Sequence, residues 1–67
     1  MGEDQLQALI DLLHERFDPT ILVQVRRSYC VLVTLGARTV HMNLEDDEEP
    51  GVWCRKIIRR MCRDQDE

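Results

Sequence analysis

The sequence is poor in residues that interrupt or cross-link a small protein, with two prolines, three glycines and three cysteines in 67 residues. The number of cysteines is odd and none stands two residues from another, which argues against a disulfide framework and a zinc knuckle. We therefore expect free thiols. Cys54 and Cys62 are predicted to be small buried apolar residues and not nucleophiles.

Long hydrophobic runs are also missing. No stretch approaches the roughly 20 apolar residues of a membrane-spanning helix, and the first residues lack the basic segment followed by an apolar one that marks a secretion signal. We expect no membrane association. An intracellular, cytoplasmic setting with reduced thiols is the default expectation.

The groups that a catalyst needs are absent as well. The sequence contains no glycine-rich phosphate loop, no paired catalytic acids, no metal-ligand spacing and no nucleophile beside a base. His14 and His41 fall on different predicted elements, and neither has an acidic partner at a recognisable spacing. We therefore predict a protein that is not an enzyme, with no catalytic residues, no metal site and no cofactor.

What the sequence does contain is typical of a folded domain. Its 43% hydrophobic and 33% charged residues place it in the globular class, and its length allows a single domain over residues 1–67. The net charge of −4 argues against nonspecific binding to nucleic acid or to an anionic membrane. This balance favours protein partners.

Apolar residues recur at the spacing of one helical stripe, which predicts a first helix over residues 5–17. Asp4 is expected to cap its start with a side-chain oxygen. Asp18 is expected to end it, because a residue that precedes proline is disfavoured in the α conformation. The stripe consists of Leu6, Leu9, Ile10, Leu13 and Phe17.

Residues 20–44 are rich in Val, Ile, Thr and Leu, which predicts three short strands. Gly36-Ala37 predicts a two-residue type II′ turn between the second and third strands, because glycine readily adopts the positive φ of the first central position. This turn places Val33 opposite Val40 and Val31 opposite Met42, with Tyr29 opposite Leu44 one step further on.

The turn between the first two strands is predicted from the requirement that the apolar side chains of both strands lie on the same sheet face. A two-residue loop would send the valines of the first strand to the polar face, whereas a three-residue loop of residues 26–28 places Val23 opposite Val31 and Val25 opposite Tyr29. We therefore predict the three-residue loop. Both helices are expected to cover the resulting apolar face, which consists of Ile21, Val23, Val25, Tyr29, Val31, Val33, Val40, Met42 and Leu44.

The opposite sheet face mixes polar and apolar side chains. In the predicted register Leu22, Leu32 and His41 form one cross-strand row among glutamine, threonine and asparagine residues. This face is too polar for a second core and more apolar than a plain solvent-exposed face. We predict that these three residues bind a partner protein, and that a second copy docks there or at an unpaired strand edge to form a homodimer.

A last helix is predicted to begin at Pro50, whose fixed φ suits the first helical turn. Five acids, Glu45–Glu49, precede it and suit the positive end of the helix dipole. Residues 64–67 are expected to form a disordered acidic tail. The apolar positions of the helix are Val52, Trp53, Cys54, Ile57, Ile58, Met61 and Cys62, and the basic positions are Arg55, Lys56, Arg59, Arg60 and Arg63.

The elements predict an α+β fold, a two-layer α-β-β-β-α sandwich with a three-stranded antiparallel meander and two helices on one face. This order resembles that of double-stranded RNA-binding domains and of the small proteins of the signal recognition particle Alu domain. The loop Arg26-Arg27-Ser28 replaces the Gly-Pro-x-His loop of the RNA-binding domains, and Pro50-Gly51-Val52-Trp53 replaces their lysine cluster. The resemblance is therefore one of topology alone.

We expect a non-enzymatic protein-interaction module, in the role of a small regulatory or inhibitory binding protein. The predicted partner-binding residues are Leu22, Leu32, His41, Arg55, Arg59, Arg60 and Arg63. The alternative is a double-stranded-RNA-binding-like domain that uses Arg26, Arg27, Arg55, Lys56, Arg59 and Arg60. An engineered or idealised fold without function is a further alternative. The acidic run is interpreted as a solvated loop, with docking on an arginine-rich partner as the other interpretation.

Overall fold

The computed structural model describes residues 2–65 and contains the five predicted elements in the predicted order. They are α1 (Glu3–Arg16), β1 (Leu22–Arg27), β2 (Cys30–Leu35), β3 (Arg38–Asn43) and α2 (Pro50–Gln65). Because α2 continues to Gln65, the prediction of a disordered tail from residue 64 is wrong for its first two residues. Residues 66 and 67 of that predicted tail lie outside the described residues.

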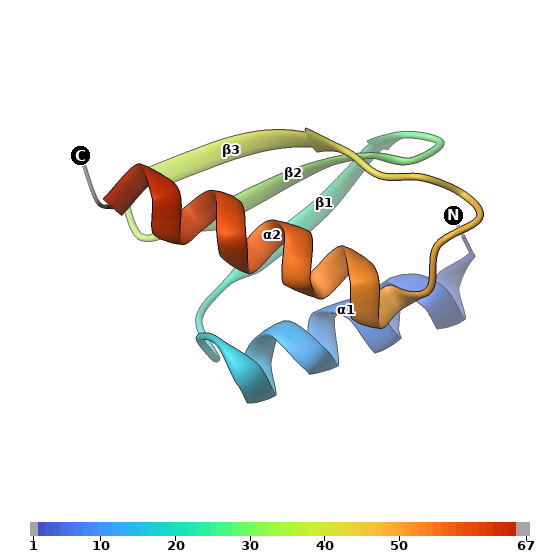
Figure 1. Cartoon of the computed structure of the whole chain (residues 1–67), viewed down its shortest axis with the longest axis horizontal. Helices are drawn as coiled ribbons and strands as arrows, with labels where there is room; N and C mark the ends of the chain where they lie inside the picture. The colour runs from blue at the N-terminus through green and yellow to red at the C-terminus, as the bar shows by residue number, and fades with distance from the viewer. Residues whose placement is uncertain (1, 66–67) are drawn as a thin grey trace.

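The three strands form an antiparallel sheet in the order β1-β2-β3, and both helices lie on one side of it (Figure 1). This arrangement confirms the predicted α+β sandwich. Val31, in the central strand, is completely buried, whereas Leu22 on the other face is 65% exposed. The prediction of which sheet face the helices cover is therefore confirmed.

The core lies between the sheet and the two helices, and apolar side chains from all five elements reach it. Trp53 is the largest of the completely buried side chains. No polar or charged side chain of the described residues is buried. The buried residues are Leu9, Leu13, Ile21, Val31, Val33, Val40, Leu44, Trp53, Cys54, Ile57 and Met61.

The β2–β3 hairpin has the predicted register, with Val33 opposite Val40 and Val31 opposite Met42. Gly36 has a φ of +62° and Ala37 has a negative φ, which is the combination that a type II′ turn requires. Beyond the strands, the backbone N–H of Leu44 donates to the carbonyl of Tyr29 at 2.8 Å. The predicted pairing is thus extended to the start of the acidic run.

The β1–β2 hairpin differs from the prediction. Val23 lies opposite Val33 and Val25 opposite Val31, two positions from the predicted partners, and the turn consists of Ser28 and Tyr29. The ladder shifts between Val25 and Arg27, where a β-bulge adds one residue to β1. Neither turn residue adopts a positive φ, so type I′ and II′ turns, which match the strand twist, are excluded here. The extra residue of the bulge compensates for the two-residue turn and returns the valines of β1 to the apolar face.

This shift by two positions keeps every side chain of β1 on its predicted face, because side chains alternate with a period of two. Burial along β1 nevertheless declines toward the hairpin. Ile21, just before the strand, is buried, Val23 is half-buried, and Val25 is 38% exposed. Val25 is therefore on the predicted face but is not a core residue.

Helix α1 begins two residues earlier than predicted. The N-cap is Gly2, whose backbone N–H donates to Oε1 of Gln5 at 3.1 Å, and Asp4 lies inside the first turn. The predicted capping role of Asp4 is thus wrong. At the other end, the backbone N–H groups of Phe17 and Asp18 both donate to the carbonyl of Leu13, and the helix ends at Arg16, one residue before the predicted end.

The turn after α1 yields a prediction about pH. Oδ1 of Asp18 accepts from the hydroxyl of Thr20 at 2.5 Å and from its backbone N–H at 2.8 Å, and these bonds lower the pKa of the carboxyl below its ordinary value. Since the folded pKa is lowered, the stabilisation is present above the ordinary pKa and is lost as the pH falls through the folded pKa.

We expect Thr20→Ala to raise the pKa of Asp18 toward its ordinary value, because the hydroxyl bond is the largest cause of the shift. Carboxyl-carbon NMR titration measures it directly. Thr39→Ala, at an exposed strand position, serves as the control and should leave the pKa of Asp18 unchanged. An unchanged pKa in the Thr20 variant would contradict this assignment.

Candidate functional site

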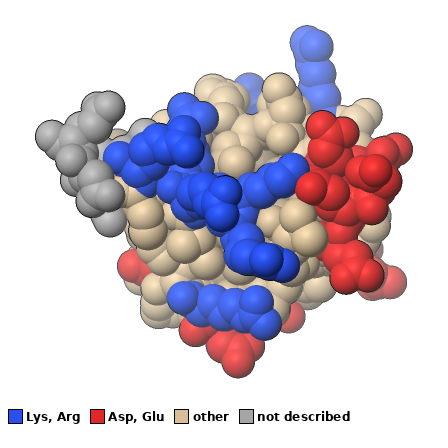
Figure 2. All heavy atoms as spheres, viewed as in Figure 1, with Lys and Arg blue, Asp and Glu red and all other residues tan. Residues whose placement is uncertain are grey.

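The strongest candidate site is the outer surface of α2. Trp53, Ile57 and Met61 recur every four residues and are buried, so the remaining positions of the helix turn outward. Arg55 and Arg59 are exposed on the side opposite this buried stripe. Figure 2 shows the basic side chains gathered over α2. We call this surface the basic face; it consists of Arg55, Lys56, Arg59, Arg60 and Arg63.

Two shallow concavities lie on the basic face. One, of about 210 Å³, extends from α2 to β3 and is lined by Met42, Lys56, Arg59, Arg60 and Arg63. The other, of about 240 Å³, is lined by Val52, Arg55, Lys56 and Arg59. The two concavities share Lys56 and Arg59, and each combines an apolar side chain with several cations. Guanidinium groups in such an arrangement suit the recognition of carboxylates, because they donate two parallel hydrogen bonds.

The cations of this face differ in how they are paired. Lys56 is half-buried, and its Nζ forms an ion pair with Oε1 of Glu48 at 2.6 Å. The side chains of Arg55 and Arg59 form no hydrogen bond or ion pair with any described residue. Both guanidinium groups are therefore available to an external acid.

The acidic loop, Glu45–Glu49, borders the basic face (Figures 1 and 2). Trp53 fixes the start of the loop, since its indole Nε1–H donates to the carbonyl of Glu45 at 2.9 Å. The carbonyl of Glu49 fixes the end by accepting from the backbone N–H of Val52 at 2.9 Å and of Trp53 at 3.2 Å. The loop therefore presents its carboxylates from a defined position beside the helix start.

The structure separates the basic residues predicted to bind RNA. Arg55, Lys56, Arg59 and Arg60 lie together on α2, but Arg26 and Arg27 lie at the far end of β1, next to the hairpin turn. The acidic loop leaves β3 beside this hairpin and returns to the start of α2 (Figure 1). The two basic groups therefore do not form one surface.

The predicted sheet-face site lies on the other side of the molecule. Leu32 is opposite Gln24 and His41, whereas Leu22 is opposite Thr34. The predicted row of Leu22, Leu32 and His41 is thus wrong for Leu22, because β1 is shifted by two positions. Leu22 and His41 are exposed and Leu32 is half-buried. This face presents separated apolar groups and shares no surface with α2.

The histidines and cysteines provide no reactive pair. Nε2 of His14 lies 2.9 Å from the carbonyl of Ile21 and donates to it, so this ring ties the end of α1 to the start of β1. Cys54 is buried, and desolvation raises the pKa of its thiol. Cys62 is exposed, against the prediction, because it lies roughly 140° around the helix from the centre of the buried stripe.

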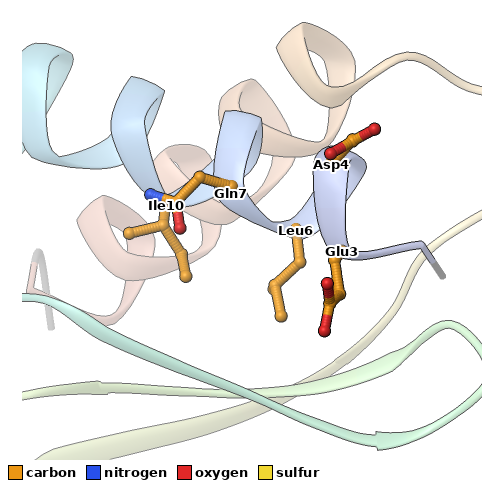
Figure 3. A pocket seen from close by; sticks show the side chains of 5 residues that line it. All are labelled: Glu3, Asp4, Leu6, Gln7 and Ile10. Atoms are coloured by element: carbon orange, nitrogen blue, oxygen red, sulfur yellow. The ribbon is translucent and has the colours of Figure 1, made fainter.

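A further concavity of about 400 Å³ lies on α1 and is lined by Glu3, Asp4, Leu6, Gln7 and Ile10. Leu6 and Ile10 point toward the sheet, and Asp4 points away from it (Figure 3). Sequence reasoning assigned Leu6 and Ile10 to the core and did not predict this hollow. All of its lining residues belong to one helix, and no set of charged groups converges on it.

Sequence reasoning also missed three contributors to the basic face. Met42 and Val52 have the pattern of core residues, and nothing in the sequence distinguishes Glu48 among five consecutive acids as the partner of Lys56. Within residues 2–65 no cluster of histidine, cysteine, aspartate or glutamate could hold a metal ion. In the same range no helix is long and apolar enough to cross a membrane. No family model matches the chain, and no curated protein or solved structure is significantly similar to it.

Proposed function

We propose that the protein is a non-enzymatic interaction module that binds an acidic segment of another protein across the basic face of α2. Such a module would act as a small regulatory or inhibitory binding protein. The observation that carries the proposal is the pair of adjoining concavities that share Lys56 and Arg59. A chain crossing both could place carboxylates on the arginines and apolar side chains against Met42 and Val52.

A protein segment fits this surface better than duplex RNA does. The basic face is bounded on one side by the acidic loop, whose carboxylates would repel a continuous phosphate backbone. Arg26 and Arg27, which an RNA-binding domain would add to the surface, lie beyond that loop. A short acidic segment can end before the loop, so it meets the cations without the repulsion.

The test is fluorescence anisotropy with a labelled peptide of glutamate, aspartate and leucine. We expect the wild-type protein to bind it and the affinity to fall with added salt, because exposed charges are screened. Arg55→Glu with Arg59→Glu should weaken binding at least tenfold, or about 1.4 kcal/mol. The matched control is Arg26→Glu with Arg27→Glu, which changes the net charge equally and should retain binding.

Duplex RNA provides the second arm of the experiment. Tight, salt-sensitive binding of RNA that is lost in both double variants would favour the RNA-binding alternative. Equal loss of peptide binding in both variants would show that only net charge matters. Failure of the wild-type protein to bind the peptide at low salt would overturn the proposal.

A further inference from the structure

The basic face and the acidic loop lie next to each other on one surface of the molecule (Figure 2). We propose that this surface binds a second copy of the chain about a two-fold axis, so that the acidic loop of each copy meets the basic face of the other. The inference rests on the proposed function, since it identifies one acidic segment that the basic face recognises. The partner in this case is the chain itself.

The charges on this surface are equal in number and opposite in sign. Five consecutive acids form the loop, and five basic residues form the face. Four of the loop acids are exposed, and their side chains have no hydrogen bond or ion pair with any described residue. Those four are Glu45, Asp46, Asp47 and Glu49. Much of the charge on each side is therefore not neutralised within the monomer.

A two-fold interface requires a patch that is complementary to itself. The basic residues extend for about 12 Å along α2 at 1.5 Å per residue, and the acidic loop adjoins the N-terminal end of that helix. An axis that lies in the contact plane, perpendicular to α2 and between the two regions, would set the two α2 helices antiparallel. Each acidic loop would then face the cations of the other copy. The dipoles of the two antiparallel helices then point in opposite directions, which is electrostatically favourable.

The ion pair inside the monomer supports this recognition. Glu48 of the loop already binds Lys56 of the basic face at 2.6 Å, so a carboxylate of this loop and a cation of this helix meet at a good distance. Arg55 and Arg59 lie on the outer side of the helix, where the chain's own loop makes no such pair with them. A second copy supplies the missing acids.

The dimensions of the molecule indicate a weak dimer. Its broadest face measures 32 by 21 Å, which is of the order of the roughly 800 Å² per partner that a standard interface buries. An interface of this size with mainly exposed charges depends strongly on salt. Association is therefore expected at low ionic strength and high protein concentration.

The sheet face is the less suitable surface for a second copy. Leu22 and Leu32 do not lie in one row, and their cross-strand partners Thr34, Gln24 and His41 are polar, so no apolar row crosses the three strands. A homodimer through that face remains the prediction from sequence. Charge reversals on α2 and in the acidic loop, compared with Leu22→Lys, separate the two surfaces.

Sedimentation equilibrium of two charge-reversed variants tests the proposal. One variant carries Arg55→Glu and Arg59→Glu, and the other carries Asp46→Arg and Asp47→Arg, all at exposed positions. Each variant alone should be monomeric at low salt, because both loop-to-face contacts of its two-fold dimer would then join like charges. An equimolar mixture should form a one-to-one complex, because both contacts are then attractive. Circular dichroism establishes that each variant is folded.

The matched control replaces the first variant by Arg26→Glu with Arg27→Glu, which has the same net charge. Mixed with the Asp46/Asp47 variant it should form no heterodimer, because the basic face of the control then meets the arginines of a reversed loop. On its own the control should form dimers as the wild type does, because its loop and basic face are unchanged. A heterodimer in the control mixture, or none in the first mixture, would overturn the inference. The inference would also be overturned if dimers persisted in both charge-reversed variants and were lost in the Leu22→Lys variant.

These outcomes are distinct from failure of the proposed function. If the wild-type protein binds the acidic peptide but the charge-reversed mixture stays monomeric, only the self-association is wrong. If the peptide does not bind either, the basic face does not recognise acids and both proposals fail. If both succeed, the peptide should compete with the dimer and return the chain to monomers.

Discussion

Val31→Asp is expected to unfold the protein. Val31 lies in the central strand between Val25 and Met42 and is completely buried. An aspartate there would lose its hydration without gaining a partner, because no polar or charged side chain of the described residues is buried. The cost of several kcal/mol compares with a total stability of about 3–10 kcal/mol at 0.05–0.15 kcal/mol per residue. Far-ultraviolet circular dichroism should show the loss of helix and strand.

The matched control is Leu22→Asp, which introduces the same side chain on the opposite sheet face. Leu22 is 65% exposed, so its carboxylate would stay hydrated, and we expect a loss of about 1 kcal/mol or less. The difference in stability between the two variants measures how much more a carboxylate costs on the covered sheet face than on the exposed one. A folded Val31→Asp protein, or two variants of equal stability, would contradict the assignment of the core face.

Trp53→Ala is expected to cost about 3–5 kcal/mol, the usual range for removing a large buried aromatic side chain. The indole is completely buried, and its ring lies 5.9 Å from that of Tyr29 in a tilted arrangement. It also donates to the carbonyl of Glu45, so its loss should loosen the acidic loop. Urea denaturation followed by circular dichroism measures the stability without relying on tryptophan fluorescence.

Trp53→Phe separates these contributions. Phenylalanine keeps most of the apolar contact but lacks the N–H donor, so it removes the hydrogen bond to the carbonyl of Glu45. We expect a smaller loss, of about 1–2 kcal/mol. Equal losses from Trp53→Phe and Trp53→Ala would show that the hydrogen bond, which both variants lack, dominates over the buried ring.

The type and order of the elements could be predicted from the sequence, because each has a clear local pattern. The apolar stripe of α1 has a period close to that of a helix, and Gly36 can adopt the positive φ that a II′ turn needs. The apolar face of the sheet was also predictable. It follows from the alternation of side chains, which even an error of two positions in β1 does not alter.

Other features depend on tertiary contacts that no local pattern records. The bulge after Val25 replaces the three-residue loop, since several turns satisfy the same alternation and only packing decides between them. Cys62 has the hydrophobicity of a core residue but lies too far around α2 to reach the sheet. For the candidate site, the basic positions of α2 were predictable from spacing. The concavities that involve Met42 and Val52 were not, because they depend on how α2 lies against β3.

The placement of both helices on one sheet face has a consequence for the order in which the chain folds. The two hairpins join neighbouring segments and can form within microseconds, whereas the contact between α1 and α2 closes a loop that contains the entire sheet. During synthesis the strands emerge before α2, so Val31, Val33 and Val40 lack half of their cover until Trp53, Ile57 and Met61 follow. The nascent meander is then an apolar surface with two open edges, the state in which a small β-rich chain is most prone to aggregate.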